Sequence, residues 1–123
     1  MYDREIVLSC LRDILHALET VGVRSKAIVN PEDLVADEAG REKLDAICMQ
    51  LIAVGEALKQ IDKMTHGSLL PGDKGIEWEK AMKMRDFIAH HYFDIDHEVV
   101  FLVCKTHVPI ITDTIRELIA GMQ

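Results

Sequence analysis

The chain has 123 residues, of which 49% are hydrophobic and 28% are charged, a size and balance typical of one globular domain. Its 21 acidic residues outnumber the 14 lysines and arginines, and the net charge of −7 argues against a protein that binds nucleic acid over its whole surface. No apolar run approaches the roughly 20 residues of a membrane-spanning helix, and the N-terminus lacks the pattern of a signal peptide. We therefore expect a single cytoplasmic domain, residues 1–123, with no membrane contact.

The three cysteines argue against both a disulfide framework and a zinc ribbon. Cys10, Cys48 and Cys104 are an odd number and are far apart in the sequence, without closely spaced pairs. We expect reduced thiols in the core.

Apolar residues recur at helical spacing through the first part of the chain. Asn30 followed by Pro31 predicts a short helical turn, because asparagine caps helix starts and proline fits the first helical position. A second apolar stripe predicts a long helix from about Gly40 to Ile61, and Gly55 on that stripe lets another helix approach closely. The first stripe, with gaps of four, three, four and three positions, predicts a helix over residues 3–23; its members are Val7, Leu11, Ile14, Leu18 and Val21.

The second half of the chain begins with a glycine-rich segment, residues 65–77, which predicts the longest loop. A helix from Trp78 to about His91 is expected next, with methionines and aromatic residues as core filling. The last helix should start at Asp94 or Asp96, either of which can cap it.

Pro109 interrupts the apolar stripe of the last helix. We expect a kink or break near Lys105, because proline removes one hydrogen bond and crowds the carbonyl four residues back. The apolar run Val99–Val103 predicts a helical turn buried on all sides. Together these elements predict an all-α, antiparallel bundle of four main helices plus a short one.

The densest group of reactive side chains lies in residues 85–94. On a continuous helix Asp86 and His90 are four positions apart and share a face, so the carboxylate can orient the imidazole. Arg85 and Tyr92 share an adjacent strip if the helix persists that far. An imidazole can take a proton from a 2′-hydroxyl, and a guanidinium can stabilise charge on phosphate oxygens. The group suits metal-free RNA cleavage, and the same residue types also form solvated ion-pair faces.

The stretch Met84–Phe93 resembles the R-x4-H-x-Y signature of the HepT toxins, the DUF86 branch of the HEPN superfamily. The likeness extends to the Gly55-Glu56-Ala57 run, to Trp78 and to Asp96, in the right order. The resemblance implies a helical, dimeric ribonuclease toxin in which Arg85 and His90 are catalytic. Asp86 departs from the asparagine of many relatives and adds negative charge beside the phosphate.

The same resemblance implies a partner, a small nucleotidyltransferase antitoxin that transfers AMP to Tyr92 and so silences the nuclease. From the residue alone, Tyr92 also fits a half-buried packing position at a helix end. A dimer has a chemical reason as well, since transesterification of RNA uses a base and an acid, and each chain offers one motif histidine. The expected partners are thus a second copy of the chain, the antitoxin and RNA, with no DNA.

A second hypothesis is a non-catalytic helical dimer that binds a minimal nucleotidyltransferase and contributes to nucleotide binding. The complete motif favours the ribonuclease, because a scaffold does not need these residue types together. The histidines and aspartates of residues 90–97 lack a recognised metal-ligand spacing. We therefore expect no metal and no cofactor.

Overall fold

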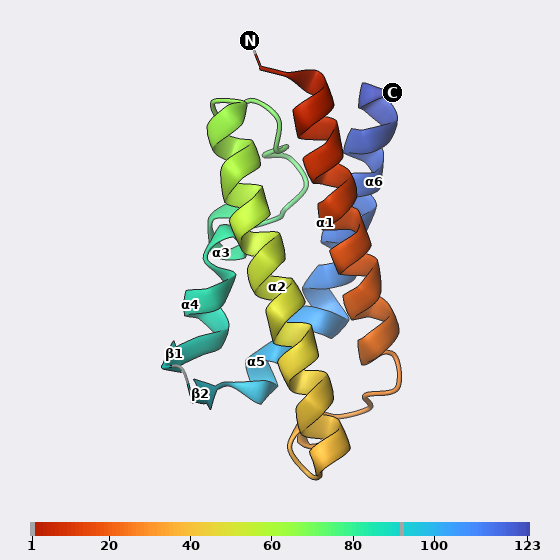
Figure 1. Ribbon diagram of the computed structural model, residues 1–123, viewed down its shortest axis with the longest axis vertical. Helices are drawn as coiled ribbons and strands as arrows, with labels where there is room; N and C mark the ends of the chain where they lie inside the picture. The colour runs from red at the N-terminus through yellow and green to blue at the C-terminus, as the bar shows by residue number, and fades with distance from the viewer. Residues whose placement is uncertain (1, 92) are drawn as a thin grey trace.

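Three long helices run along the length of the molecule in the computed structural model, which describes residues 2–91 and 93–123 except for the side chains of His90 and His91 (Figure 1). These helices are α1 (Arg4–Ser25), α2 (Glu38–Met64) and α6 (Val108–Met122). Helix α1 runs opposite to the other two, so the start of α1 and the end of α6 lie at the same end of the molecule. The predicted all-α class is confirmed.

Aspartates set where the first two long helices begin. The carboxylate of Asp3 accepts the backbone N–H groups of Glu5 and Ile6, at 3.0 and 3.2 Å, and Asp37 accepts that of Gly40 at 2.7 Å. Each cap satisfies N–H groups that have no partner within the helix. The two helices match the predicted ranges to within a few residues.

The long helices bury one apolar core along their facing sides. Its fully buried members include the residues of the predicted first stripe and their partners on α2 and α6: Leu11, Ile14, Leu18, Ile47, Leu51, Leu58, Ile61 and Ile115. The 3₁₀ turn η1 (Pro31–Leu34) closes one end of this core and confirms the turn predicted at Pro31. It lies so close to α2 that a Cβ added to Gly40 would overlap the carbonyl of Asp33.

The predicted helix from Trp78 to His91 is wrong beyond its first turns. The chain forms two five-residue helices, α3 (Trp78–Met82) and α4 (Met84–Ile88), followed by a small hairpin of β1 (Ala89–His91) and β2 (Asp94–Ile95). Ala89 is extended, with φ −143° and ψ 124°. Ala89, His90 and His91 are not strong strand formers, so the strand is imposed by its contacts with the rest of the chain.

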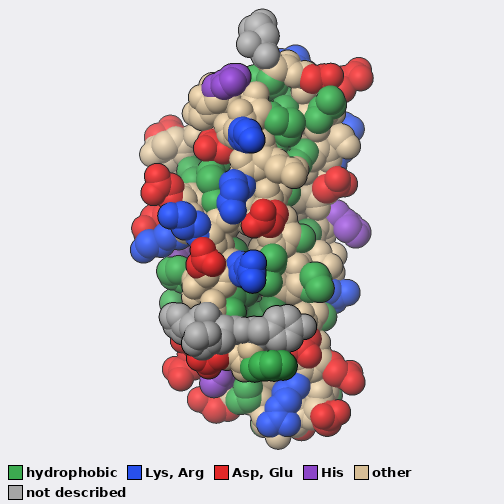
Figure 2. All heavy atoms as spheres, turned by 60° about the vertical axis from the view of Figure 1, so that its left-hand side comes forward, with side chains coloured by type: hydrophobic (Ala, Val, Ile, Leu, Met, Phe, Trp, Pro, Cys, Tyr) green, Lys and Arg blue, Asp and Glu red, His purple; other side chains and the backbone are tan. Residues whose placement is uncertain are grey.

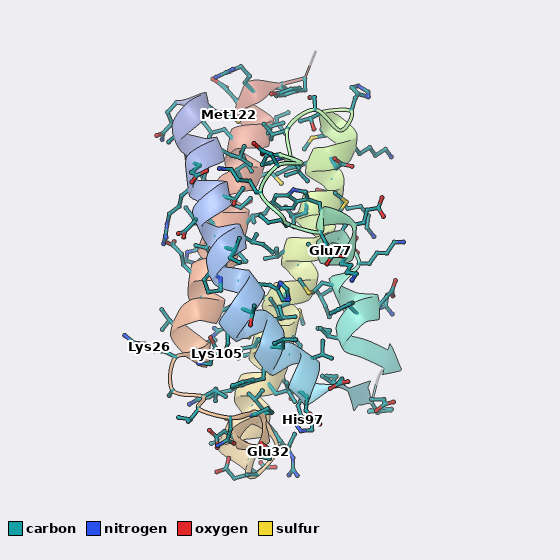
Figure 3. The ribbon with its side chains drawn as sticks, turned by 180° about the vertical axis from the view of Figure 1, so that it is seen from behind. Lys26, Glu32, Glu77, His97, Lys105 and Met122 are labelled. Carbon is teal, nitrogen blue, oxygen red and sulfur yellow. The ribbon has the colours of Figure 1, made fainter. Side chains whose placement is uncertain are left out.

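The last predicted helix is interrupted as expected from Pro109. It consists of α5 (His97–Leu102), a π-helical turn η2 (Val103–His107) and α6, and α5 runs obliquely to α6 (Figure 1). The π turn accommodates the crowding that proline imposes near Lys105. The Lys105 ammonium donates to the carbonyl of Ser25 at 2.7 Å, which ties this turn to the end of α1 (Figure 3).

The expectation that residues 99–103 are buried on all sides is wrong, because Leu102 is 53% exposed. Asp96 is the residue that caps α5, accepting the N–H groups of Glu98 and Val99 at 3.1 Å each.

No helix in the described part of the chain combines the length and apolar character needed to cross a membrane.

Candidate active site

Helix α4 presents the first half of the R-x4-H-x-Y segment to solvent. Met84 and Ile88, four positions apart, are 5% and 1% exposed and anchor one face of the helix in the core. The three residues between them, Arg85, Asp86 and Phe87, are therefore on the exposed side. The predicted catalytic arginine lies where a ligand can reach it.

The guanidinium of Arg85 forms no hydrogen bond or ion pair with any residue that the structure describes, and neither does the carboxylate of Asp86. Lys83, at the joint between α3 and α4, is also exposed and unpaired within the same described set. Lys80 is instead engaged, with Glu77 at 3.0 Å and over the ring of Phe87 at 5.9 Å. No described acidic side chain thus pairs with Arg85 or Lys83, which makes both suited to bind an anion.

The segment that forms α3 and α4 carries equal numbers of cations and acids in a chain that is strongly acidic. Residues 77–88 carry three cations and three acids, whereas the whole chain has 14 and 21. Figure 2 shows Lys and Arg side chains along the face that comes forward from the left of Figure 1, with acidic side chains among them. The cations that a phosphate could meet here thus lie on α3 and α4 and the joint between them, while two further acids, Asp94 and Asp96, follow in the adjoining hairpin and directly after it.

The part of the motif that contains His90 follows α4 directly. It lies in the β1–β2 hairpin, which backbone hydrogen bonds connect to the end of α4. The backbone of His90 lies in β1, and β1 pairs with β2 in the antiparallel register Ala89–Ile95 and His91–Asp94. The N–H of Asp96 donates to the carbonyl of Ile88 at 2.9 Å, which closes the hairpin against the end of α4.

This geometry corrects one sequence inference. Helix α4 ends at Ile88, so Asp86 and His90 do not share a helical face, and the helix does not persist as far as the argument that linked Arg85 with Tyr92 required. The role of Asp86 in orienting the imidazole of His90 stays a prediction, and the shared helical face no longer supports it. The side chain of His90 and the whole of Tyr92, predicted as the base and as the modification site, lie outside the described residues.

The predicted close approach at Gly55 is confirmed, and it occurs beside the candidate site. A Cβ added there would lie 2.8 Å from the carbonyl oxygen of Ala81 and 3.2 Å from the Cβ of Met84. The backbone at the joint of α3 and α4 thus rests directly on α2.

Sequence reasoning missed a cavity of about 130 Å³ on another side of α3 and α4. The residues that line it include Ala81, Met84, Phe87, Val103, Ile110 and Ile111, with Lys80 and His107 among its polar members. These residues come from segments far apart in the chain, so no local pattern could have indicated the cavity.

No three His, Cys, Asp or Glu side chains come together as a metal site within residues 2–91 and 93–123, apart from the two histidine side chains not described.

Comparison with known proteins identifies the family. The family model described as "Ribonuclease HepT-like" matches residues 14–118, which is most of the chain. A curated protein of Methanocaldococcus jannaschii, named "Putative RNase MJ0127", is 26% identical over 93 residues, which are 74% of each of the two chains. No solved structure matches the chain. From the extent of the family match, the chain belongs to the HepT-like ribonuclease family.

Proposed function

We propose that this protein is a metal-independent endoribonuclease, the toxin of a toxin–antitoxin pair. The observation that carries the proposal is the exposed guanidinium of Arg85, which has no partner among the described residues and lies five positions before His90 in a HepT-like chain. A free guanidinium is the group that binds a phosphodiester and stabilises charge developing on it. Because the chain belongs to the HepT-like ribonuclease family, we expect the anion that Arg85 binds to be a phosphate of RNA.

In the proposed reaction the imidazole of His90 takes the proton of a 2′-hydroxyl. The 2′-oxygen then bonds to the adjacent phosphorus, and the bond from phosphorus to the 5′-oxygen breaks. The leaving oxygen takes a proton from an acid, which gives a 2′,3′-cyclic phosphate and a 5′-hydroxyl. Arg85 stabilises the negative charge on the non-bridging oxygens, and no metal is needed.

The acid is proposed to be the motif histidine of a second copy of the chain, because each chain has only one such residue. The exposed apolar side chains around the site support a surface that another chain covers: Phe87 is 43% exposed and Phe93 is 95% exposed. A two-fold axis there would also bring two copies of Arg85 near one phosphate, which an acidic chain needs.

Tyr92 is proposed as the site where a nucleotidyltransferase antitoxin attaches AMP. The modification would place a bulky anion in the motif that holds Arg85 and would block the phosphate site by charge and volume. Intact mass after incubation with the cognate transferase and ATP tests this, with Tyr92→Phe as the control. An unmodified wild-type protein would contradict the proposal.

The direct test is cleavage of RNA by the purified protein in the presence of EDTA. We expect Arg85→Ala and His90→Ala each to lower the rate by about 10²–10³-fold, the cost of removing one group that stabilises or promotes the transition state. Arg12→Ala is the matched control, because Arg12 is also exposed but lies on α1. Stability should stay within about 0.5 kcal/mol in the two arginine variants.

The dimeric site has its own test. Mixing Arg85→Ala chains with His90→Ala chains should restore part of the activity if each site uses groups from both copies. Unchanged cleavage by both single variants would contradict the catalytic roles of Arg85 and His90. No cleavage by the wild-type protein would instead favour the non-catalytic dimer that binds a nucleotidyltransferase.

A further inference from the structure

Gly55 lies where α2 supports the joint between α3 and α4. Built onto its backbone, a Cβ would be 2.8 Å from the oxygen of Ala81, 3.2 Å from the Cβ of Met84 and 3.3 Å from the oxygen of Met82. Two of these three atoms belong to the backbone, so they cannot move aside by a change of rotamer. The segment can pack this closely on α2 only because residue 55 has no side chain.

The contacts of Gly55 lead directly to the candidate catalytic arginine. Met84 is buried and precedes Arg85 in the same five-residue helix. A helix this short has little stability of its own, so its position is imposed by what it packs on. A shift of the backbone at Met84 therefore moves Arg85 with it.

The cavity of about 130 Å³ gives this segment room to move. Ala81 and Met84 line it, together with residues of η2 and α6, and no residue of α2 is among those that line it in the described structure. A side chain added at residue 55 would therefore push α3 and α4 away from α2 and into free space. The expected response is a displaced α4 in a folded protein, because tight packing does not oppose the shift there.

We propose that Gly55 is a positioning residue for Arg85, because it sets how deeply α4 rests on α2 and hence where the guanidinium meets the RNA phosphate. This inference rests on the proposed ribonuclease function. Placement matters because an error of about 1 Å in a catalytic group can lower the rate by about 10²-fold.

The test is Gly55→Ala, with Gly22→Ala as the matched control. Both glycines lie inside long helices, and a Cβ added at Gly22 meets no atom within 4 Å. Under single-turnover conditions we expect Gly55→Ala to lower the rate of RNA cleavage at saturating protein by about 10-fold or more, and Gly22→Ala to leave it unchanged. Circular dichroism should show both variants folded.

A double-mutant cycle separates positioning from general damage. If Gly55 acts through Arg85, Gly55→Ala should cause no further loss in the Arg85→Ala background. An equal fold-loss in both backgrounds would overturn the inference, and so would a folded Gly55→Ala protein with the wild-type rate. Should Gly55→Ala fail to fold, Met84→Ala replaces it in the cycle, because that change loosens α4 from the same support; a wild-type rate would again contradict the inference.

A measurement independent of activity distinguishes failure of this inference from failure of the proposed function. The backbone amide resonances of residues 81–88 should shift in Gly55→Ala and stay in place in Gly22→Ala. Unmoved resonances overturn the positioning role whatever the activity. Moved resonances in a protein whose cleavage does not depend on Arg85 would support the positioning of α4 and contradict the ribonuclease proposal.

Discussion

The frame formed by α1, α2 and α6 differs sharply from the motif segment, residues 78–96. The frame helices have 22, 27 and 15 residues, whereas the elements of the motif segment have five residues or fewer. Isolated helices below about 12 residues are marginal in water, so the short elements hold their shape through contacts with the rest of the molecule. The frame is stabilised by its own length and core, and the motif segment is positioned by a few anchors.

The largest loss of stability is expected when a core residue of the frame is truncated. Leu51 of α2 is fully buried, and Leu51→Ala should lower the free energy of unfolding by about 2–5 kcal/mol through lost burial and a cavity. Met49→Ala on the same helix is the control, because Met49 is 68% exposed. Urea denaturation followed by circular dichroism measures both, and equal losses would contradict the assignment of the core.

A smaller effect is expected from an anchor of the motif segment. Asp96→Ala removes the carboxylate that caps α5 and should cost about 0.5–2 kcal/mol. Asp96→Ala keeps the backbone N–H that closes the hairpin onto Ile88, but the uncapped start of α5 holds this position less firmly. Amide hydrogen exchange should therefore speed up in β1 and β2 before it does in α1. Asp94→Ala is the control, because the N–H groups at the start of α5 bond to Asp96 and not to Asp94. Uniform exchange throughout the chain would show that the frame and the motif segment unfold as one cooperative unit.

Two buried thiols, Cys48 of α2 and Cys104 of η2, predict that the stability of the fold depends on alkaline pH. Burial raises the pKa of Cys48 to about 12 and that of Cys104 to about 11, above the ordinary value of 9.0. A thiol with a raised pKa favours the folded state below about pH 9, and this stability is lost as the unfolded chain ionises between pH 9 and the folded pKa. Thermal midpoints should thus fall less steeply above pH 9 in Cys48→Ala than in the wild type; identical slopes would argue against the contribution.

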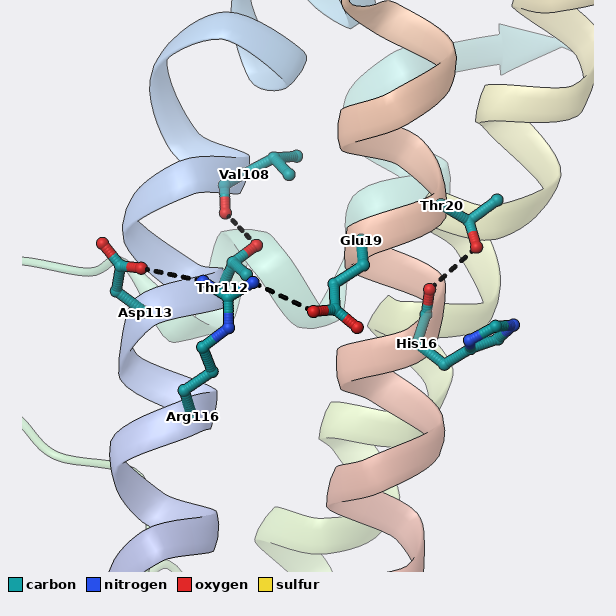
Figure 4. A network of polar contacts seen from close by, with 7 residues as sticks. All are labelled: His16, Glu19, Thr20, Val108, Thr112, Asp113 and Arg116. Atoms are coloured by element: carbon teal, nitrogen blue, oxygen red, sulfur yellow. Dashed lines mark hydrogen bonds and ion pairs between the residues drawn. The ribbon is translucent and has the colours of Figure 1, made fainter.

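The smallest effect should come from the surface link between two frame helices. Arg116 of α6 contacts Glu19 of α1 at 2.9 Å and Asp113 at 3.3 Å, beside hydroxyl bonds from Thr112 and Thr20 to their own helices (Figure 4). Hydrogen bonds and charge interactions with Glu19 and Asp113 raise the pKa of Arg116, whose side chain is exposed. Arg116→Ala should shift the urea midpoint less than Asp96→Ala, and the shift should shrink in high salt. A large, salt-independent shift would mean that this link is part of the frame's core stability.

The same contrast explains how far the sequence predicts the structure. Apolar stripes and capping residues predicted α1 and α2, because a long amphipathic helix is encoded by its own residues. Pro109 predicted the interruption near Lys105 for the same reason, as its effect is local. The family was also readable from the motif and its context, and the family match over residues 14–118 confirms that resemblance.

Residues 85–91 could not be placed from their spacing. Four-residue spacing between Asp86 and His90 is the same whether the chain is helical or extended, and the choice depends on contacts made elsewhere. Where the helix ends, the carbonyl of Ile88 accepts the N–H of Asp96, eight residues further on, instead of an N–H of a continuing helix. Such contacts follow from tertiary packing, which local periodicity does not encode.

The π turn at Val103–His107 has a consequence for changes in chain length. Removing a single residue from this turn would rotate α6 by about 100° relative to α5, since each residue of a helix turns the chain by that angle. Ile111 and Ile115 would then face away from α1, although every remaining side chain would be unchanged. We expect this region to tolerate substitutions far better than insertions or deletions, so its number of residues matters more than their identity.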